Sequence, residues 1–336
     1  MNKVNIVFEF KNNPWGGGNQ FLRNLKKTFT DNNSYSTNIL SAKFILFNSH
    51  HNYIKILFLK YLYPSKIFVH RIDGPMDYRN DGSLLNNLIQ KLNHLVADGT
   101  VFQSKWSKIN NQNINTKFKK IIYNAPDNNI FNISNKIKFE NKRIRIISTC
   151  WSKNLNKGHD DYLYLDKNLD FKKYEVLFIG RTNNKFNNIK HIQPLEGNKI
   201  INYFINSNIF FFPSKLEACS NSLIEAIHSG LAIVASNTSS NPELIKKNGL
   251  CYSSQNDIIK QINNVSNNLK NYQKIHNLPN LETVSKEYTN FFDHINELIM
   301  KHEYTSKKIN FFSCFYFIIK YSLLMFVEKI KIKIIK

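Results

Sequence analysis

Short apolar runs alternate with amphipathic stretches along most of the chain. The apolar runs have the length and the β-branched and aromatic content of buried strands, and the stretches between them place apolar residues at helical spacing. This alternation predicts an α/β fold with parallel sheets. In the first half we expect strands at residues 4–10, 43–47, 67–72, 100–103 and 120–123, and helices at 20–29, 52–61 and 84–95.

Polar residues 127–141 interrupt the pattern and predict a linker. Each half is expected to form a Rossmann-like doubly wound domain, and a cleft between two such domains is the natural ligand site. The expected bounds are 1–135 and 136–300, followed by a tail at 301–336. In the second half we expect strands at 144–148, 176–179, 209–212, 231–235 and 250–252, and helices at 160–169, 199–206, 221–229 and 242–247.

The tail contains a strongly apolar stretch, residues 309–327, which only Lys320 interrupts. Its length is just sufficient to cross a bilayer. The central lysine and the basic flank favour a helix lying in the interface of an anionic membrane instead. A final helix packed on the protein is the alternative. The basic flank consists of Lys329, Lys331, Lys333 and Lys336.

The charge balance narrows the possible partners. Lys and Arg number 46 against 24 Asp and Glu, so the formal net charge of the 336-residue chain is +22. Such an excess favours anionic partners, although a well-solvated basic surface is the simpler explanation. Zinc-finger spacing and RNA-binding aromatic signatures are absent from the sequence, so we expect no nucleic-acid partner. Four scattered cysteines and no expected signal peptide indicate a cytoplasmic protein.

Two motifs carry glycines or lysines at strand–helix turns, where helix N-termini favour phosphate. Gly16, Gly17 and Gly18 follow the first expected strand, and glycines let a backbone approach a ligand closely. Lys157 precedes a glycine before an expected helix, and Lys153 lies four residues earlier. For the glycines the alternative is that they only form a tight connection between strand and helix. For the lysines the alternative is that they only extend into solvent.

Two further motifs carry acids. Glu217 follows an expected buried strand, and Glu225 lies after seven intervening residues in the next helix. These carboxylates could accept hydrogen bonds from sugar and ribose hydroxyls, although residues 222–225 also fit a capping box. His70 and Asp73 stand at the carboxyl end of another strand, where doubly wound sheets bind ligands. The alternatives are that His70 is a core residue and that Asp73 pairs with an arginine to hold the loop.

Taken in order, these motifs resemble the family 4 retaining glycosyltransferases, or glycosyl transferases group 1, which have the GT-B fold. The resemblance covers about residues 1–300, and the string 212–236 is similar to the family's donor-site signature throughout. It implies an N-terminal acceptor domain, a C-terminal nucleotide-sugar donor domain and a hexosyltransferase-type activity (EC 2.4). The other segments that carry it are Gln103-Ser104-Lys105-Trp106-Ser107, Tyr123-Asn124-Ala125-Pro126-Asp127 and Asn241-Pro242-Glu243.

The resemblance also implies roles for individual residues. Lys157 would bind the donor diphosphate, Glu225 the ribose, and Glu217 the transferred sugar. His70 or Asp73 would lie near the reacting sugar. The family usually has an arginine where this chain has Trp151 and Ser152, and Lys153 is expected to substitute for it. The donor would also contact Gly16, Gly17, Gly18, Ser220, Asn221 and Ser222.

The expected reaction moves a sugar from a nucleotide-diphosphate co-substrate to a glycan or lipid-linked acceptor, in polysaccharide biosynthesis at the inner face of the membrane. The sequence has no Asp-x-Asp motif, so we expect retention without metal or other cofactor, because a lysine and helix N–H groups can stabilise the leaving phosphate. Three alternatives remain: a nucleotide-sugar epimerase, an inactive membrane-bound partner of another transferase, and a nucleic-acid binder that rests on charge alone.

Overall fold

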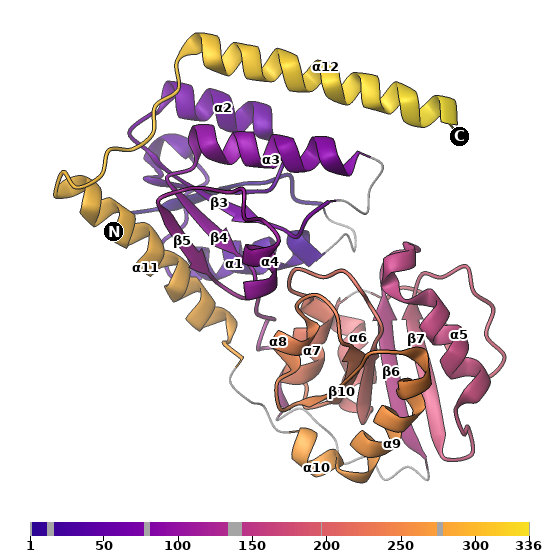
Figure 1. The fold of residues 1–336 in the computed structure, drawn as a ribbon. Coiled ribbons are helices and arrows are strands. Elements are labelled where there is room, and N and C mark those ends of the chain that lie inside the picture. Colours follow the sequence, from indigo (N-terminus) through magenta and orange to yellow (C-terminus); the bar gives the residue numbers. More distant parts are fainter. Residues whose placement is uncertain are drawn as a thin grey trace. The chain divides into compact units, whose positions relative to one another are not determined.

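A computed structural model describes residues 2–11, 17–76, 81–133, 143–195, 197–273 and 278–335. The chain divides into two compact units, each built on one parallel sheet (Figure 1). Unit 1 comprises Met1–Phe10, Leu25–Tyr123 and Glu282–Lys336, and unit 2 comprises Lys11–Asn24 and Asn124–Leu281.

The sheet of unit 1 has the strand order β1-β2-β3-β4-β5, with every pair parallel. Tyr35 also makes a parallel bridge to Val4 of β1. Tyr35 and β2 lie on opposite edges of β1. The chain therefore leaves β1 on the side of Tyr35 and then crosses to the side of β2. The first strand is therefore the switch point of a doubly wound arrangement. The strands are β1 (Val4–Val7), β2 (Phe44–Asn48), β3 (Ile67–Ile72), β4 (Gly99–Phe102) and β5 (Phe118–Ile121).

Apolar side chains that alternate along these strands bury both faces of the sheet. On one face Ile45, Phe47 and Phe68 pack with buried residues of α2, α3 and α12. On the other, Phe44 stacks on Phe292 of α11 at 5.1 Å between ring centroids. The helices are α1 (Gly17–Asp31), whose first residues belong to unit 2, α2 (Tyr53–Leu62), α3 (Gly82–Val96), α4 (Lys105–Ile109), α11 (Leu281–Met300) and α12 (Phe311–Ile335).

The sheet of unit 2 has the order β11-β10-β9-β6-β7-β8. From β6 the chain first adds β7 and β8 on one side and then β9 on the other, so the switch point lies between β6 and β9. The strands are β6 (Ile144–Cys150), β7 (Tyr174–Gly180), β8 (Lys190–Ile192), β9 (Ile209–Phe212), β10 (Ala232–Ser236) and β11 (Gly249–Tyr252). The helices are α5 (His159–Asn168), α6 (Gly197–Ile205), α7 (Asn221–His228), α8 (Asn241–Ile245), α9 (Ile258–Asn267) and α10 (Leu269–Tyr272).

The predicted α/β class, the two parallel-sheet domains and the C-terminal apolar helix are confirmed. Two details differ from the expectation. The exposed strand β8 was not predicted, because its sequence is short and polar. Residues 282–300 were expected in the second domain, but they belong to unit 1, where Phe291 and Ile295 pack on the Cβ-free face of Gly99. Part of the predicted linker, residues 134–141, lies outside the described residues.

Candidate active site

The site in unit 2 forms where two loops meet at the switch point of the sheet. One loop follows β6 and carries Lys157, and the other follows β9 and carries Glu217. The N–H of Lys215 donates to the carbonyl of Asn156 at 2.7 Å, so backbone atoms join the loops directly. Ligands of parallel α/β sheets bind at this place, outside the carboxyl ends of the strands.

Lys157 ends a short 3-10 turn, Leu155–Lys157, and Gly158 then caps α5, which begins at His159. Gly158 has φ +72°, a left-handed conformation that favours glycine. A Cβ at this position would also lie 2.4 Å from the carbonyl oxygen of Pro213 in the other loop. Only glycine therefore lets the two loops approach so closely, and this approach places the ammonium of Lys157 beside Glu217.

Lys157 Nζ forms an ion pair with Glu217 Oε1, and both side chains remain partly exposed, at 30% and 16%. Ser214 Oγ donates to the same carboxylate oxygen at 2.6 Å. The backbone N–H of Glu217 donates to Ser239 Oγ at 3.1 Å, which fixes the start of the acidic loop. A cation and an acid are thus held side by side at the carboxyl ends of β6 and β9.

Helix α7 carries the second of the two predicted acids, Glu225. Ser220 caps the helix, because its Oγ accepts from the N–H of Leu223 at 3.4 Å. Ser222 is therefore not the cap, and the capping-box alternative for residues 222–225 is wrong. Glu225 is buried and accepts from Gln20 Nε2 at 3.0 Å. Burial raises the pKa of Glu225 to about 7, although the Gln20 hydrogen bond opposes the shift.

Asn221, the first residue of α7, connects this helix to the glycine-rich turn. Its Nδ2 donates to the carbonyl of Gly17 at 2.8 Å, and its Oδ1 accepts from Asn124 Nδ2 at 2.8 Å. Gly17 and Gly18 are the first residues of α1. The structure therefore brings part of the predicted glycine motif to α7, while Gly16 lies outside the described residues. Lys153 is exposed on the loop before Lys157.

Unit 1 gathers a separate polar group at the carboxyl edge of its sheet. Asp73, just after β3, accepts from Asn48 Nδ2 and Ser49 Oγ at 2.9 Å each and from Arg71 Nη1 at 3.1 Å. Gln103, just after β4, also donates to it. Burial alone would raise the pKa of Asp73, but the Arg71 charge and these hydrogen bonds hold it below its usual value. Asp73 is therefore an ionised, partly exposed acceptor.

The surroundings of His70 differ from those expected for a side chain that contacts a substrate. Its side chain is fully buried and stacks on Phe47 at 4.2 Å between ring centroids. Its Nε2–H donates to the carbonyl of Ser49 at 2.9 Å, and Nδ1 accepts from Asn93 at 3.1 Å. Burial lowers its pKa to about 3, so the ring is neutral. The core-histidine alternative is correct, and His70 positions Ser49 instead of contacting a ligand.

Several polar residues around these sites were not assigned roles from the sequence. Ser214 and Ser239 hold Glu217, and Gln20 meets Glu225. Asn48 and Ser49 hold Asp73, and Ser49 has a left-handed φ of 45°. Serine and asparagine are common in loops, so their identities alone give no signal. Only the approach of distant strand ends in the folded chain reveals them.

Comparison with known proteins places the acid–lysine site of unit 2 in a recognised domain. Residues 156–278 match the family model described as Glycosyl transferases group 1. The matched segment begins one residue before Lys157 and includes Glu217 and Glu225. No curated protein matches the whole chain at a significant level.

Solved structures with the GT-B fold resemble the chain over most of its length. Anabaena Alr3699/HepE, in a complex with UDP and glucose, has a TM-score of 0.63 and 12% identity, covering 90% of this chain and 99% of its own. A glycosyltransferase from Rickettsia africae ESF-5 has a TM-score of 0.59 and 15% identity, covering 86% and 85%. Sucrose-phosphate synthase from Thermosynechococcus elongatus has a TM-score of 0.57 and 11% identity, covering 87% and 82%.

At these identities the structures establish the fold, which is GT-B. The matched domain is that of group 1 glycosyl transferases. Fold and domain together support a GT-B glycosyltransferase.

Proposed function

We propose that this protein is a family 4 glycosyltransferase of the hexosyltransferase type, which takes its sugar from a nucleotide-diphosphate donor. The observation that carries the proposal is the Lys157–Glu217 pair at the switch point of unit 2, inside the matched domain. The complexes of HepE with UDP and glucose support a nucleotide-sugar donor for a chain of the same fold.

In the proposed complex, the donor diphosphate replaces Glu217 as the partner of Lys157. Glu217 is then available to accept hydrogen bonds from hydroxyls of the transferred sugar. Glu225 holds the ribose hydroxyls, and the N-terminus of α7 with Ser220, Asn221 and Ser222 faces the phosphates together with the glycines of α1. The apolar surroundings of Glu225 make each such hydrogen bond stronger than it would be in water.

The proposed reaction breaks the bond between the anomeric carbon and the β-phosphate oxygen and forms a bond from that carbon to an acceptor hydroxyl oxygen. The hydroxyl proton passes to the departing phosphate oxygen, so atoms and charge balance without a dedicated base. Lys157 and helix N–H groups stabilise the charge that develops on the leaving diphosphate. We propose retention of configuration and metal independence on this basis.

A second cation for the diphosphate is proposed in place of the arginine that the resemblance implies near residue 151. Lys153 was the expected substitute. Arg181, just after β7, is another candidate, because its Nη1 donates to the carbonyl of Trp151 at 3.4 Å. Alanine substitution of Lys153 and of Arg181 in turn, followed by calorimetric titration with UDP, identifies which cation contributes to donor affinity.

We further propose that Asp73 and its neighbours in unit 1 face a glycan or lipid-linked acceptor of polysaccharide biosynthesis. The proposed location is cytoplasmic, on the inner face of the membrane. The apolar helix α12 and the lysines of its last turns support a membrane location, since interfacial helices combine these features.

The donor assignment predicts a large loss of activity when either Lys157 or Glu225 is replaced. Lys157→Ala and Glu225→Ala should each slow sugar transfer from the donor by on the order of tenfold to a thousandfold, the range for removing one such group. The measurement is transfer, or donor hydrolysis if the acceptor is unknown, with a panel of nucleotide sugars.

Lys167→Ala, an exposed lysine in the last turn of α5, is the matched control and should retain activity. Circular dichroism should show that all three variants are folded. Near wild-type rates in both site variants would refute the donor assignment.

A further inference from the structure

Two helices of unit 1 carry most of the large apolar side chains that the described residues expose. Of nineteen such side chains, four belong to α2 and ten to α12. Soluble monomers rarely expose apolar patches beyond a few hundred Å². The exposed members on α2 are Ile54, Phe58, Tyr61 and Leu62, and those on α12 are Phe311, Phe312, Phe315, Tyr316, Ile319, Leu323, Leu324, Phe326, Val327 and Ile330.

Helix α12 uses one stripe of its surface to pack on the unit. Cys314, Phe317 and Tyr321 are buried at helical spacing and join the core formed with α2 and α3. Most of the remaining side chains of the helix are also apolar, and ten of them are exposed, with Phe312 at 83% and Phe326 at 61%. A helix that is apolar all round and only partly covered indicates a second apolar environment on its outer side.

Specific contacts hold α12 along the unit. Tyr53 OH and Ser322 Oγ lie 2.9 Å apart, and Tyr321 OH bonds to Asn87 Oδ1. The rings of Tyr61 and Phe311 lie 6.0 Å apart between centroids. Figure 1 shows the first part of α12 running beside α2 and α3, with its C-terminal end extending beyond them. The two exposed apolar faces are therefore continuous and form one surface, which we call the α2–α12 face.

The segment before α12 is also fixed. Buried Asp98 accepts from Lys60 Nζ at 2.9 Å, from the N–H of Lys307 at 2.8 Å and from Ser306 Oγ at 3.0 Å. Lys60 belongs to α2. The start of α12 is therefore tied to α2 through a buried ion pair, so the helix cannot readily turn away from the unit.

The charges on the α2–α12 face are almost all positive. Lys55, Lys320, Lys329 and Lys331 are exposed on the two helices. Within the described part of these helices the only acid is Glu328, which lies 3.8 Å from Lys331. This combination suits the surface of an anionic bilayer, and it disfavours a second copy of the chain, whose lysines would repel these.

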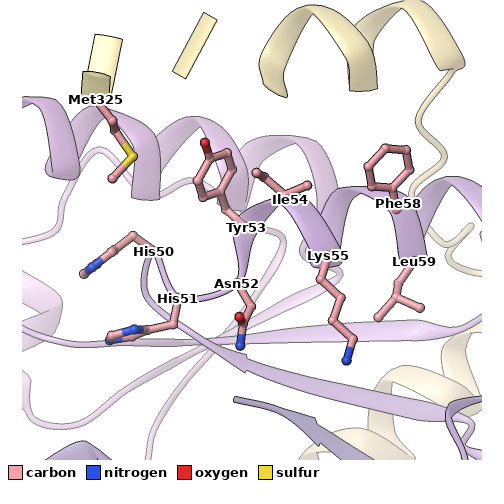
Figure 2. Close-up of a pocket in the computed structure, with 9 residues that line it drawn as sticks. All are labelled: His50, His51, Asn52, Tyr53, Ile54, Lys55, Phe58, Leu59 and Met325. Atoms are coloured by element: carbon pink, nitrogen blue, oxygen red, sulfur yellow. The ribbon is translucent and has the colours of Figure 1, made fainter. Parts of the chain in front are cut away.

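A pocket of about 640 Å³ lies at the edge of this face. Figure 2 shows Met325 of α12 opposite the turn of His50 and His51 and the first turn of α2. Lys55 and Phe58 also line the pocket. His50, which lines the pocket, directly follows Ser49, which holds Asp73. His51, also in the lining, is near enough to Asp73 for its charge to help lower the pKa of that carboxyl. The pocket therefore lies close to the polar group of unit 1.

We propose that the α2–α12 face is a docking surface for an anionic lipid bilayer and that α12 lies in the membrane interface, side-on, without crossing it. The inference deepens the proposed function, because it places the polar group around Asp73 beside the layer from which a lipid-linked acceptor would come. Crossing is disfavoured because the stripe Cys314–Phe317–Tyr321 would have to leave its partners on α2 and α3.

The test uses the 336-residue chain and flotation with vesicles of phosphatidylglycerol and phosphatidylethanolamine, with phosphatidylcholine vesicles for comparison. Wild type should float with the anionic vesicles and be released by alkaline carbonate, as a surface helix is. Phe312→Ser with Phe326→Ser should reduce the partition coefficient at least about tenfold, and Phe58→Ser should reduce it by a smaller factor.

Matched controls remove exposed apolar side chains elsewhere in unit 1. Ile109→Ser with Met300→Ser should bind as wild type, because both residues are exposed but lie on α4 and α11. Lys55→Glu should weaken binding to anionic vesicles, whereas Lys108→Glu, an equal change of charge on α4, should not do so to the same extent.

Three flotation results would overturn the proposal: wild type fails to float, the α12 double variant floats like wild type, or the bound protein resists release by carbonate. A fourth result would also overturn it, namely that wild type dimerises in solution, the double variant does not, and neither protein binds vesicles. Unchanged binding of Phe58→Ser would remove α2 from the surface. Vesicle binding needs no donor, so failure of the donor assignment in unit 2 leaves this test unaffected.

Discussion

At the scale of single residues, the two predicted acids of unit 2 differ in how far their carboxylates are buried and in which groups contact them. Glu217 is partly exposed and is compensated by Lys157 and Ser214. Glu225 is buried and accepts a hydrogen bond from Gln20, which is neutral. The two carboxylates therefore differ in surroundings, the first beside a cation and the second in an apolar setting.

The raised pKa of Glu225 predicts a pH-dependent stability. The pKa of Glu225 rises from 4.5 in its ordinary state to about 7 in the folded protein, because burial disfavours the charged form. A raised folded pKa contributes stability that is complete below the unfolded value and is lost as pH rises through the folded one. Relative to Glu225→Gln, wild type should therefore lose melting temperature between about pH 4.5 and pH 7.

Glu225→Gln is the control for this effect because it keeps the size of the side chain and removes its titration. All other ionisable groups are shared by the two proteins, so their contributions cancel in the difference. A difference in melting temperature that is flat from pH 4.5 to pH 8 would contradict the burial of a titrating Glu225.

At the scale of elements, the turns between strands and helices decide the geometry of the site. The turn from β6 to α5 passes through Gly158, and the loop after β9 rests against it at Pro213. Both the sign of φ and the missing Cβ are required there. A change at this glycine should therefore affect Lys157 and Glu217 together, although neither residue is altered.

Gly158→Ala tests this requirement. It places a Cβ 2.4 Å from a backbone oxygen and adds the penalty of a left-handed alanine, so we expect about 1–3 kcal/mol of lost stability and weaker UDP binding. Thermal melts and calorimetry measure the two effects.

Gly158→Asn separates the causes, because asparagine tolerates left-handed φ but keeps the clash. Equal losses in both variants indicate the clash, and a milder loss in the asparagine variant indicates backbone strain. A fully stable alanine variant would show that the loops do not approach as described.

At the scale of the whole molecule, the chain combines two units with different polar sites on the same kind of sheet edge. Unit 2 holds a cation beside an acid, and unit 1 holds a compensated aspartate next to an apolar, basic surface. The proposed division is that unit 2 takes the donor and unit 1 the acceptor.

This division predicts an uneven response to a nucleotide. Saturating UDP should slow amide hydrogen exchange most in the loops 153–158 and 213–221 of unit 2, because a bound ligand stabilises the state that binds it. The edge of unit 1 around Asn48 and Asp73 should change less. Equal protection of both edges, or protection of unit 1 alone, would contradict the assignment of the donor to unit 2.

The sequence alone determined the fold class, because strands and helices of a parallel α/β sheet have periodic patterns that are local. The ten strands expected from apolar runs are present. Lys157 and Glu217 pair because carboxyl ends of neighbouring parallel strands share one edge, whereas their predicted contacts with a donor stay predictions. Strand β8 is polar and short, so it had no such pattern.

Only the tertiary structure decided which polar residues are buried and which apolar residues are exposed. His70 is part of the core because Asn93 and Ser49, distant in sequence, enclose it. Helix α11 belongs to unit 1 because Phe291 and Phe292 pack against its sheet. The exposed apolar side of α2 is recognised as part of a larger surface only because α12 packs next to it. Burial depends on neighbours from the whole chain, whereas periodicity depends on a few adjacent residues, and this difference separates what could be predicted from what could not.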